Sequence, residues 1–205
     1  MNIIAIMGGG ARGLISLRIL MEIEKITGKP MYELFDYFGG SSVGSLIASG
    51  LLISSDGVTA KYTAHQLFNI FMSNVLNSFT WTYYSYISSG FGLIGPSYTT
   101  SGLSKIILEC CDDYKLENLL KPIIFPAYDR IRQKAYYFDR EKNKDLPLLD
   151  VMLSCCAAPT YFQSHTMKIN DEYYDFADSA LVANNNSQLV LLKATQNINL
   201  LDRSK

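Results

Sequence analysis

The sequence predicts a three-layer α/β/α fold whose central sheet is mainly parallel, within one domain that spans residues 1–205. Two observations support this prediction. A buried-strand pattern at residues 3–7 leads through a glycine-rich turn into a helical pattern at 14–27. A second short apolar stretch at 37–39 leads through another turn into an apolar run at 46–53. Strands that alternate with helices usually pair in parallel, with the helices on the faces of the sheet.

The first strand and the first helix have the clearest patterns. Residues 3–7 are all apolar, as expected of a strand that is buried on both faces. In the helical segment, apolar side chains recur on one side and charged residues occupy the positions between them. Gly28 suits the C-cap of this helix, and Pro30 prevents its continuation.

A glycine-rich loop joins this strand to this helix and consists of Gly8, Gly9, Gly10, Ala11, Arg12 and Gly13. Its spacing matches the dinucleotide-binding fingerprint, which also requires an acidic residue at the end of the next strand. That strand ends instead in Gly39, Gly40 and Ser41, which weakens the nucleotide interpretation. The alternative is an oxyanion loop, because backbone N–H groups near a helix N-terminus can bind a negative oxygen.

The second turn, Gly40-Ser41-Ser42-Val43-Gly44, matches the G-x-S-x-G pattern of a nucleophile elbow. In that turn the serine hydroxyl is exposed above a helix N-terminus, so Ser42 is a candidate covalent nucleophile. Gly40 and Gly44 let strand and helix approach closely, because neither carries a Cβ. Such a short pattern also arises by chance. Neighbouring parallel strands would place both turns at one sheet edge, where open α/β sheets carry their sites.

Composition excludes several classes of protein. The net charge of −1 gives no electrostatic basis for binding nucleic acid. The N-terminus has no signal-peptide pattern, which predicts a cytoplasmic protein or one exported by a signal-peptide-independent route. The uncharged stretch 38–55 contains the elbow, so we predict a buried strand–turn–helix there and no transmembrane span. Four cysteines lack metal-ligand spacing and are interpreted as small buried thiols in a reducing compartment: Cys110, Cys111, Cys155 and Cys156.

A serine nucleophile needs a base, and the residues alone leave its identity open. His65 lies in a helix-like segment and His165 in a polar stretch, and neither has a distinctive catalytic context. Asp178 ends a strand-like run and is followed by small residues. An aspartate in that position either faces a neighbouring loop as a base or forms a turn with its own backbone.

Together these motifs resemble those of the patatin-like phospholipases, which are lipid acyl hydrolases. The glycine loop is similar to the family's G-G-G-x-R-G, the elbow to its G-x-S-x-G, and Asp178-Ser179-Ala180 to its D-G-G or D-G-A. Further likeness comes from the flanking segments 127–129, 154–162 and 181–185. The similarity covers essentially the whole chain, and three motifs in order are far more specific than one.

The resemblance implies a Ser-Asp dyad without a catalytic histidine. Ser42 would be the nucleophile, Asp178 the proton acceptor, and amides of the glycine loop would hold the oxyanion. The implied reaction is hydrolysis of a fatty-acyl ester in a phospholipid or another acyl lipid through an acyl-enzyme, with no cofactor and no metal. The alternative is a catalytically impaired, truncated family member that binds lipid or a partner.

Three features depart from the family pattern. Met7 replaces the acidic residue that usually precedes the glycine loop, and we expect a modest effect because the amide donors remain. Ser179 replaces the glycine after the aspartate, and a serine is strained there if the position needs a positive φ. The chain ends at Lys205, whereas family members usually continue, so we expect a C-terminally truncated domain whose residues 196–201 lead towards a further strand.

Residues 78–98 are rich in aromatic side chains and contain no charge. Aromatics with a polar edge suit a membrane–water boundary, so one hypothesis is that this segment forms a lid or a peripheral membrane contact. The alternative, which we favour, is a buried part of the domain or a wall of the acyl groove.

Overall fold

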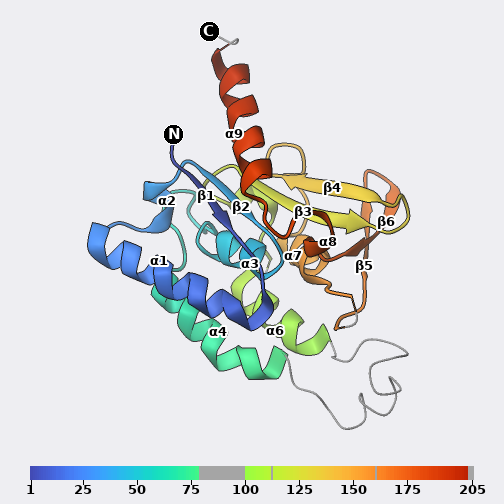
Figure 1. Ribbon diagram of the computed structural model, residues 1–205, viewed down its shortest axis with the longest axis horizontal. Coiled ribbons are helices and arrows are strands. Elements are labelled where there is room, and N and C mark those ends of the chain that lie inside the picture. The colour runs from blue at the N-terminus through green and yellow to red at the C-terminus, as the bar shows by residue number, and fades with distance from the viewer. Residues whose placement is uncertain (79–99, 112, 160, 203–205) are drawn as a thin grey trace.

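The computed structural model describes residues 1–78, 100–111, 113–159 and 161–202. Within these residues the chain forms a central sheet with helices on both sides, which confirms the predicted α/β fold (Figure 1). The aromatic segment predicted at 78–98 lies outside the described residues from 79 onward. Both hypotheses for that segment therefore stay predictions.

The described sheet has six strands in the order β1-β2-β3-β6-β5, with β4 also paired to β3. β1, β2 and β3 are parallel, whereas β4, β5 and β6 join by antiparallel pairing. The strand bounds are Ile3–Ile6 (β1), Tyr37–Gly40 (β2), Ile123–Asp129 (β3), Lys134–Asp139 (β4), His165–Ile169 (β5) and Glu172–Ala177 (β6). Because Ile6 pairs with Gly40, the glycine loop and the elbow leave the same edge of the sheet side by side.

The helices divide into two layers of unequal size. The described helices are Gly13–Thr27 (α1), Met31–Leu34 (α2), Val43–Gly50 (α3), Ala64–Ser78 (α4), Thr100–Cys111 (α6), Leu148–Cys156 (α7), Ala180–Ala183 (α8) and Ser187–Asp202 (α9). The larger core joins one side of the sheet to α1, α3, α4, α6 and α7. A smaller core on the other side packs Val190 and Ala194 of α9 against Tyr37 and Ile124.

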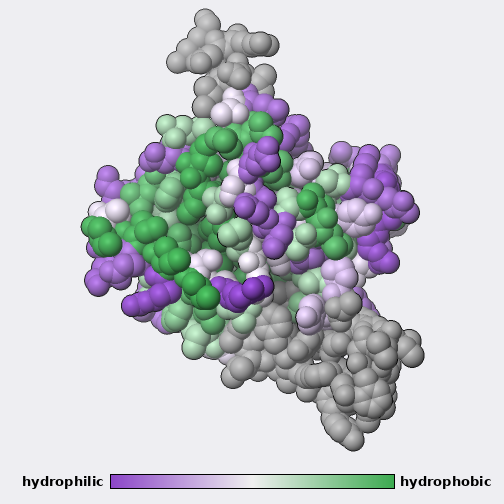
Figure 2. All heavy atoms as spheres, in the orientation of Figure 1, coloured by the Kyte–Doolittle hydropathy of each residue, from purple (hydrophilic) through white to green (hydrophobic). Residues whose placement is uncertain are grey.

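Helix α1 ends as its sequence predicts. Gly28 adopts φ 67°, a left-handed conformation, and its N–H donates to the carbonyl of Glu24 at 2.8 Å. Leu17 and Leu20 are buried on the inner side of the helix. The outer side is not wholly polar, since apolar atoms gather along α1 on the face shown in Figure 2.

Residues 196–201, which we expected to lead towards a further strand, are themselves helical, and the further strand stays a prediction. Helix α9 runs without interruption from Ser187 to Asp202. The physical reason is that no glycine or proline breaks this segment, so the turns anchored by Val190 and Ala194 continue as helix.

The remaining burial predictions agree with the structure. The stretch 38–55 forms β2, the elbow and α3, and every residue of α3 is buried. No helix in the described part of the chain combines the length and apolar character needed to cross a membrane. All four cysteines are free and buried, and burial raises the pKa of each thiol.

Candidate active site

Ser42 lies in the sharp turn between β2 and α3. Its backbone adopts φ 52° and ψ −128°, a conformation that non-glycine residues rarely take and that is often found at functional sites. The turn is tightly packed on both sides. A Cβ on Gly44 would lie 2.1 Å from the carbonyl oxygen of Ile6, and one on Gly40 would lie 2.4 Å from the backbone nitrogen of Ser45. The two glycines thus let α3 start directly against the sheet.

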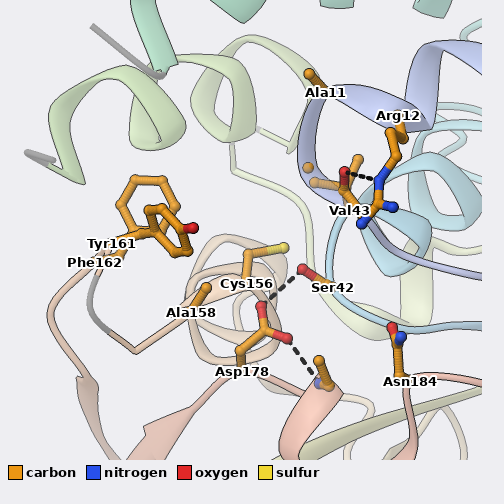
Figure 3. Close-up of a pocket in the computed structure, with 13 residues that line it drawn as sticks. Ala11, Arg12, Ser42, Val43, Cys156, Ala158, Tyr161, Phe162, Asp178 and Asn184 are labelled. Carbon is orange, nitrogen blue, oxygen red and sulfur yellow. Dashed lines mark hydrogen bonds between the residues drawn. The ribbon is translucent and has the colours of Figure 1, made fainter. Parts of the chain in front are cut away.

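Ser42 and Asp178 point toward each other across this turn (Figure 3). The Ser42 hydroxyl donates to Oδ2 of Asp178 at 2.7 Å, and the N–H of Ala180 donates to Oδ1 at 2.7 Å. The N–H of Asp178 donates to the carbonyl of Ala157, just after α7, at 2.9 Å. Two donors therefore orient the carboxylate, and the carbonyl just after α7 holds the backbone of the same residue.

The electrostatic environment makes Asp178 a stronger base than a free aspartate. The residue is only 2% exposed, and burial raises its pKa above the ordinary value. The hydrogen bonds from Ala180 and Ser42 oppose this rise, but burial is the larger effect. A carboxylate with a raised pKa accepts a proton from a serine hydroxyl more readily.

Ser179 has a role at the elbow that its sequence position did not suggest. Its backbone is helical, with φ −60°, so serine causes no strain where the family usually has glycine. Its fully buried hydroxyl accepts a hydrogen bond from the N–H of Ser42 and donates to the carbonyl of Cys155 at 3.2 Å. Ser179 thereby ties the strained turn to α7.

We predict that Ser179→Ala slows turnover more than it affects substrate binding. The variant leaves the Ser42 N–H without its acceptor, which costs about 1–3 kcal/mol of folding stability if no water replaces it. The unanchored serine should lower kcat by about tenfold or more with little change in KM. Steady-state kinetics and thermal unfolding check this, and Ser179→Thr, which keeps the hydroxyl, should be milder. An unchanged kcat in Ser179→Ala would contradict the assigned role.

The glycine loop is held against the elbow by Ser41. The N–H of Gly8 donates to Oγ of Ser41 at 3.0 Å, and that hydroxyl donates to the carbonyl of Asn184 at 2.8 Å. The amide of Gly8 is therefore occupied. Within the described residues, no protein acceptor is bonded to the N–H of Gly9 or Gly10, and both residues line the cavity beside Ser42. These two amides could therefore donate to a negative oxygen in the cavity.

A cavity of about 460 Å³ opens beside the dyad, a volume typical of small-molecule sites. It is lined by Gly9, Gly10, Ala11, Arg12, Ser42, Val43, Cys156, Ala158, Tyr161, Phe162, Asp178, Ala180 and Asn184. Figure 3 shows Tyr161, Phe162 and Ala158 on the side of the dyad away from Arg12. This apolar wall suits a hydrocarbon chain, whereas the loop amides suit a developing negative charge.

Several cavity residues were not predicted as site residues. Cys156, Ala158, Tyr161 and Phe162 lie in the segment 154–162, whose small residues and A-A-P-x-Y-F pattern were the available signal. Asn184 belongs to the Asn-rich segment after α8.

Neither histidine lines the cavity. His65 is exposed on α4, and Nε2 of His165 lies 3.0 Å from a carboxylate oxygen of Asp150 on α7. In the described residues no group of three or more His, Cys, Asp or Glu side chains could hold a metal ion.

The fold and site together define an α/β protein with a nucleophile-elbow serine hydrogen-bonded to a buried aspartate. Comparison with known proteins identifies the family. The model of the patatin-like phospholipases matches residues 4–191. The chain belongs to this family, as its motifs predicted.

Two named relatives match nearly the whole length of this chain. A cGAMP-activated phospholipase of Escherichia coli (strain TW11681) is 32% identical over 94% of this chain and 55% of its own length. Patatin-like protein 2 of Arabidopsis thaliana is 27% identical over 96% of this chain and 53% of its own length. The chain thus spans about half the length of these relatives. Among solved structures, VipD from Legionella pneumophila is 12% identical over 88% of this chain and 46% of its own, with a TM-score of 0.47.

Proposed function

We propose that this protein is a lipid acyl hydrolase that cleaves fatty-acyl esters through Ser42 and Asp178. The observation that carries the proposal is the 2.7 Å hydrogen bond between the two side chains, in a cavity that the backbone of Gly9 and Gly10 also lines. Membership of a phospholipase family supports the substrate class, a phospholipid or another acyl lipid.

In the first half-reaction, Asp178 takes the proton of Ser42 as its oxygen attacks the ester carbonyl. The carbonyl oxygen becomes negative and accepts hydrogen bonds from Gly9 and Gly10. Loss of one such donor typically costs on the order of 3 kcal/mol of transition-state stabilisation. Asp178 then returns its proton to the alcohol oxygen of the glycerol-containing fragment, the carbon–oxygen bond breaks, and the acyl group stays on Ser42.

In the second half-reaction, water attacks the acyl-enzyme carbonyl while Asp178 accepts a proton from that water. The same amides hold the second oxyanion. The bond to Ser42 breaks, Ser42 recovers the proton from Asp178, and the fatty acid leaves. No cofactor enters this cycle.

Fatty-acid release by the purified chain tests the proposal. We expect release from phospholipid micelles and hydrolysis of a short-chain nitrophenyl ester, both blocked by a fluorophosphonate. A folded protein that binds the micelles but releases no fatty acid from either substrate would contradict the proposal. That result would support the alternative, a catalytically impaired family member that binds lipid.

The raised pKa of Asp178 predicts the pH dependence of the reaction. Asp178 must be ionised to accept the serine proton, so kcat/KM should fall as the pH drops through the pKa of this residue. Because burial raises that pKa, the acidic limb should lie above 3.8, the ordinary value. The pH profile of kcat/KM on the soluble ester measures this, and a midpoint at or below 3.8 would contradict a buried carboxylate base.

A further inference from the structure

The outer side of α1 carries large apolar side chains in contact with solvent. Ile15, Ile19 and Ile26 are 63%, 58% and 77% exposed. Their spacing places them on one side of the helix, and Ile15 and Ile26 are about 16 Å apart along its axis. Met72 on the neighbouring helix α4 is also exposed, at 50%. We call the three isoleucines the α1 face, and apolar atoms follow α1 in Figure 2.

The charges around the α1 face are mostly positive, although the whole chain carries a net charge of −1. Arg12, Arg18, Lys25 and Lys29 are all exposed. Of the two acids in this stretch, Glu24 is turned inward, where its carboxylate accepts the N–H groups of Met31 and Ala64.

The other acid, Glu22, lies beside Lys25, with a 3.3 Å ion pair between them. Helix α4 contains no acidic residue at all. Apolar side chains bordered by cations are typical of helices that lie in the interface of an anionic bilayer.

The α1 face is continuous with the rim of the active-site cavity. The glycine loop runs directly into α1, and Ala11 and Arg12 line the cavity one turn before Ile15. On the other side of the loop, Met7 adds an apolar side chain that is 52% exposed.

We propose that the α1 face and its cations form a docking surface for anionic phospholipid bilayers, which presents the cavity rim to the lipid. This inference rests on the proposed function only for the identity of the substrate. The isoleucines enter the interfacial region of the bilayer, Arg18, Lys25 and Lys29 contact the lipid phosphates, and an acyl chain passes over the glycine loop to Ser42.

Vesicle sedimentation tests this surface without requiring turnover. The protein carries Ser42→Ala so that the lipid stays intact, and the vesicles contain phosphatidylcholine with or without phosphatidylglycerol. We expect binding to the anionic vesicles that weakens with added salt. Ile19→Gln/Ile26→Gln should weaken it on the order of tenfold or more, and Arg18→Gln/Lys25→Gln on the order of tenfold.

The matched control is Leu191→Gln/Leu192→Gln, which removes two side chains, each 53% exposed, from α9 and should bind as the parent does. When the same α1 substitutions are made in the wild-type protein, which keeps Ser42, they should abolish vesicle hydrolysis and leave hydrolysis of the soluble ester intact.

Absence of vesicle binding by the Ser42→Ala parent, or unchanged binding in both α1 variants, would overturn the docking surface. The docking surface would also be overturned if the parent were a dimer and the α1 substitutions made it a monomer. That result would mean that a second copy of the chain covers the α1 face. Absence of soluble-ester hydrolysis by the wild-type protein, which keeps Ser42, would refute the proposed function alone.

Discussion

Replacing Ser42 by alanine should abolish hydrolysis while the protein stays folded. In the proposed mechanism the substitution removes the oxygen that forms the acyl-enzyme, and removal of a catalytic serine costs about 10⁴–10⁶-fold in kcat in serine hydrolases. Alanine also deletes the hydrogen bond to Asp178 but leaves the Ser42 backbone, whose N–H binds Ser179, in place. Fatty-acid release from micelles and turnover of the soluble ester measure the effect.

Ser73→Ala is the matched control. The hydroxyl of this exposed serine on α4 donates to the carbonyls of Asn69 and Ile70 and accepts from the side chain of Asn74, all within the same helix. This variant should retain full activity. If Ser42→Ala kept more than about a hundredth of the wild-type kcat with an unchanged melting temperature, Ser42 would not be the nucleophile.

Replacing Asp178 by asparagine should lower kcat by about 10³–10⁴-fold, because an amide cannot accept the proton of Ser42. The loss of kcat should persist at every pH. A variant that only shifted the pKa of Asp178 would instead recover activity at higher pH. Asp175→Asn is the matched control three residues upstream, since its carboxylate faces Arg130 at 3.0 Å instead of the cavity. Equal losses in the two variants would mean that Asp178 acts only through the fold.

Asp178→Asn should leave the melting temperature at pH 7 unchanged or raise it. Burial raises the pKa of Asp178, so the folded state holds the proton more tightly than the unfolded state does. The stability that this gives is present at low pH and is lost as the pH rises through the folded-state pKa. At pH 7 the ionised carboxylate therefore destabilises the fold, and asparagine removes that effect. Thermal unfolding at pH 7 and at pH 4 measures it, and the difference between variant and wild type should shrink at the lower pH.

The N-terminal half of the fold was predictable from the sequence because its signals are local. Residues 3–7 are apolar throughout, and Gly28 marks the end of α1, so strand, loop and helix follow from neighbouring residues alone. The elbow was predictable because its G-x-S-x-G pattern is local. Its tertiary role was not, since Gly44 is needed for the close approach to Ile6 of the neighbouring strand β1.

The partnership of Ser42 and Asp178 was not predictable from the residues alone. The two positions are separated by 136 in sequence, and β6 reaches β3 by antiparallel pairing that no local pattern specifies. Only the resemblance to a family suggested the dyad. The bridging contact of Ser179 was missed because a departure from a family glycine suggested strain, whereas the backbone there is helical and the hydroxyl finds two partners.

Covalent labelling of the wild-type chain with a fluorophosphonate tests the central claim most directly. Mass spectrometry of the intact protein gives the stoichiometry, and peptide mapping locates the label. We predict one label per chain, on Ser42, with a much lower labelling rate in Asp178→Asn. A folded wild-type protein that stays unlabelled, or that carries the label on another residue, would contradict an active Ser42–Asp178 dyad.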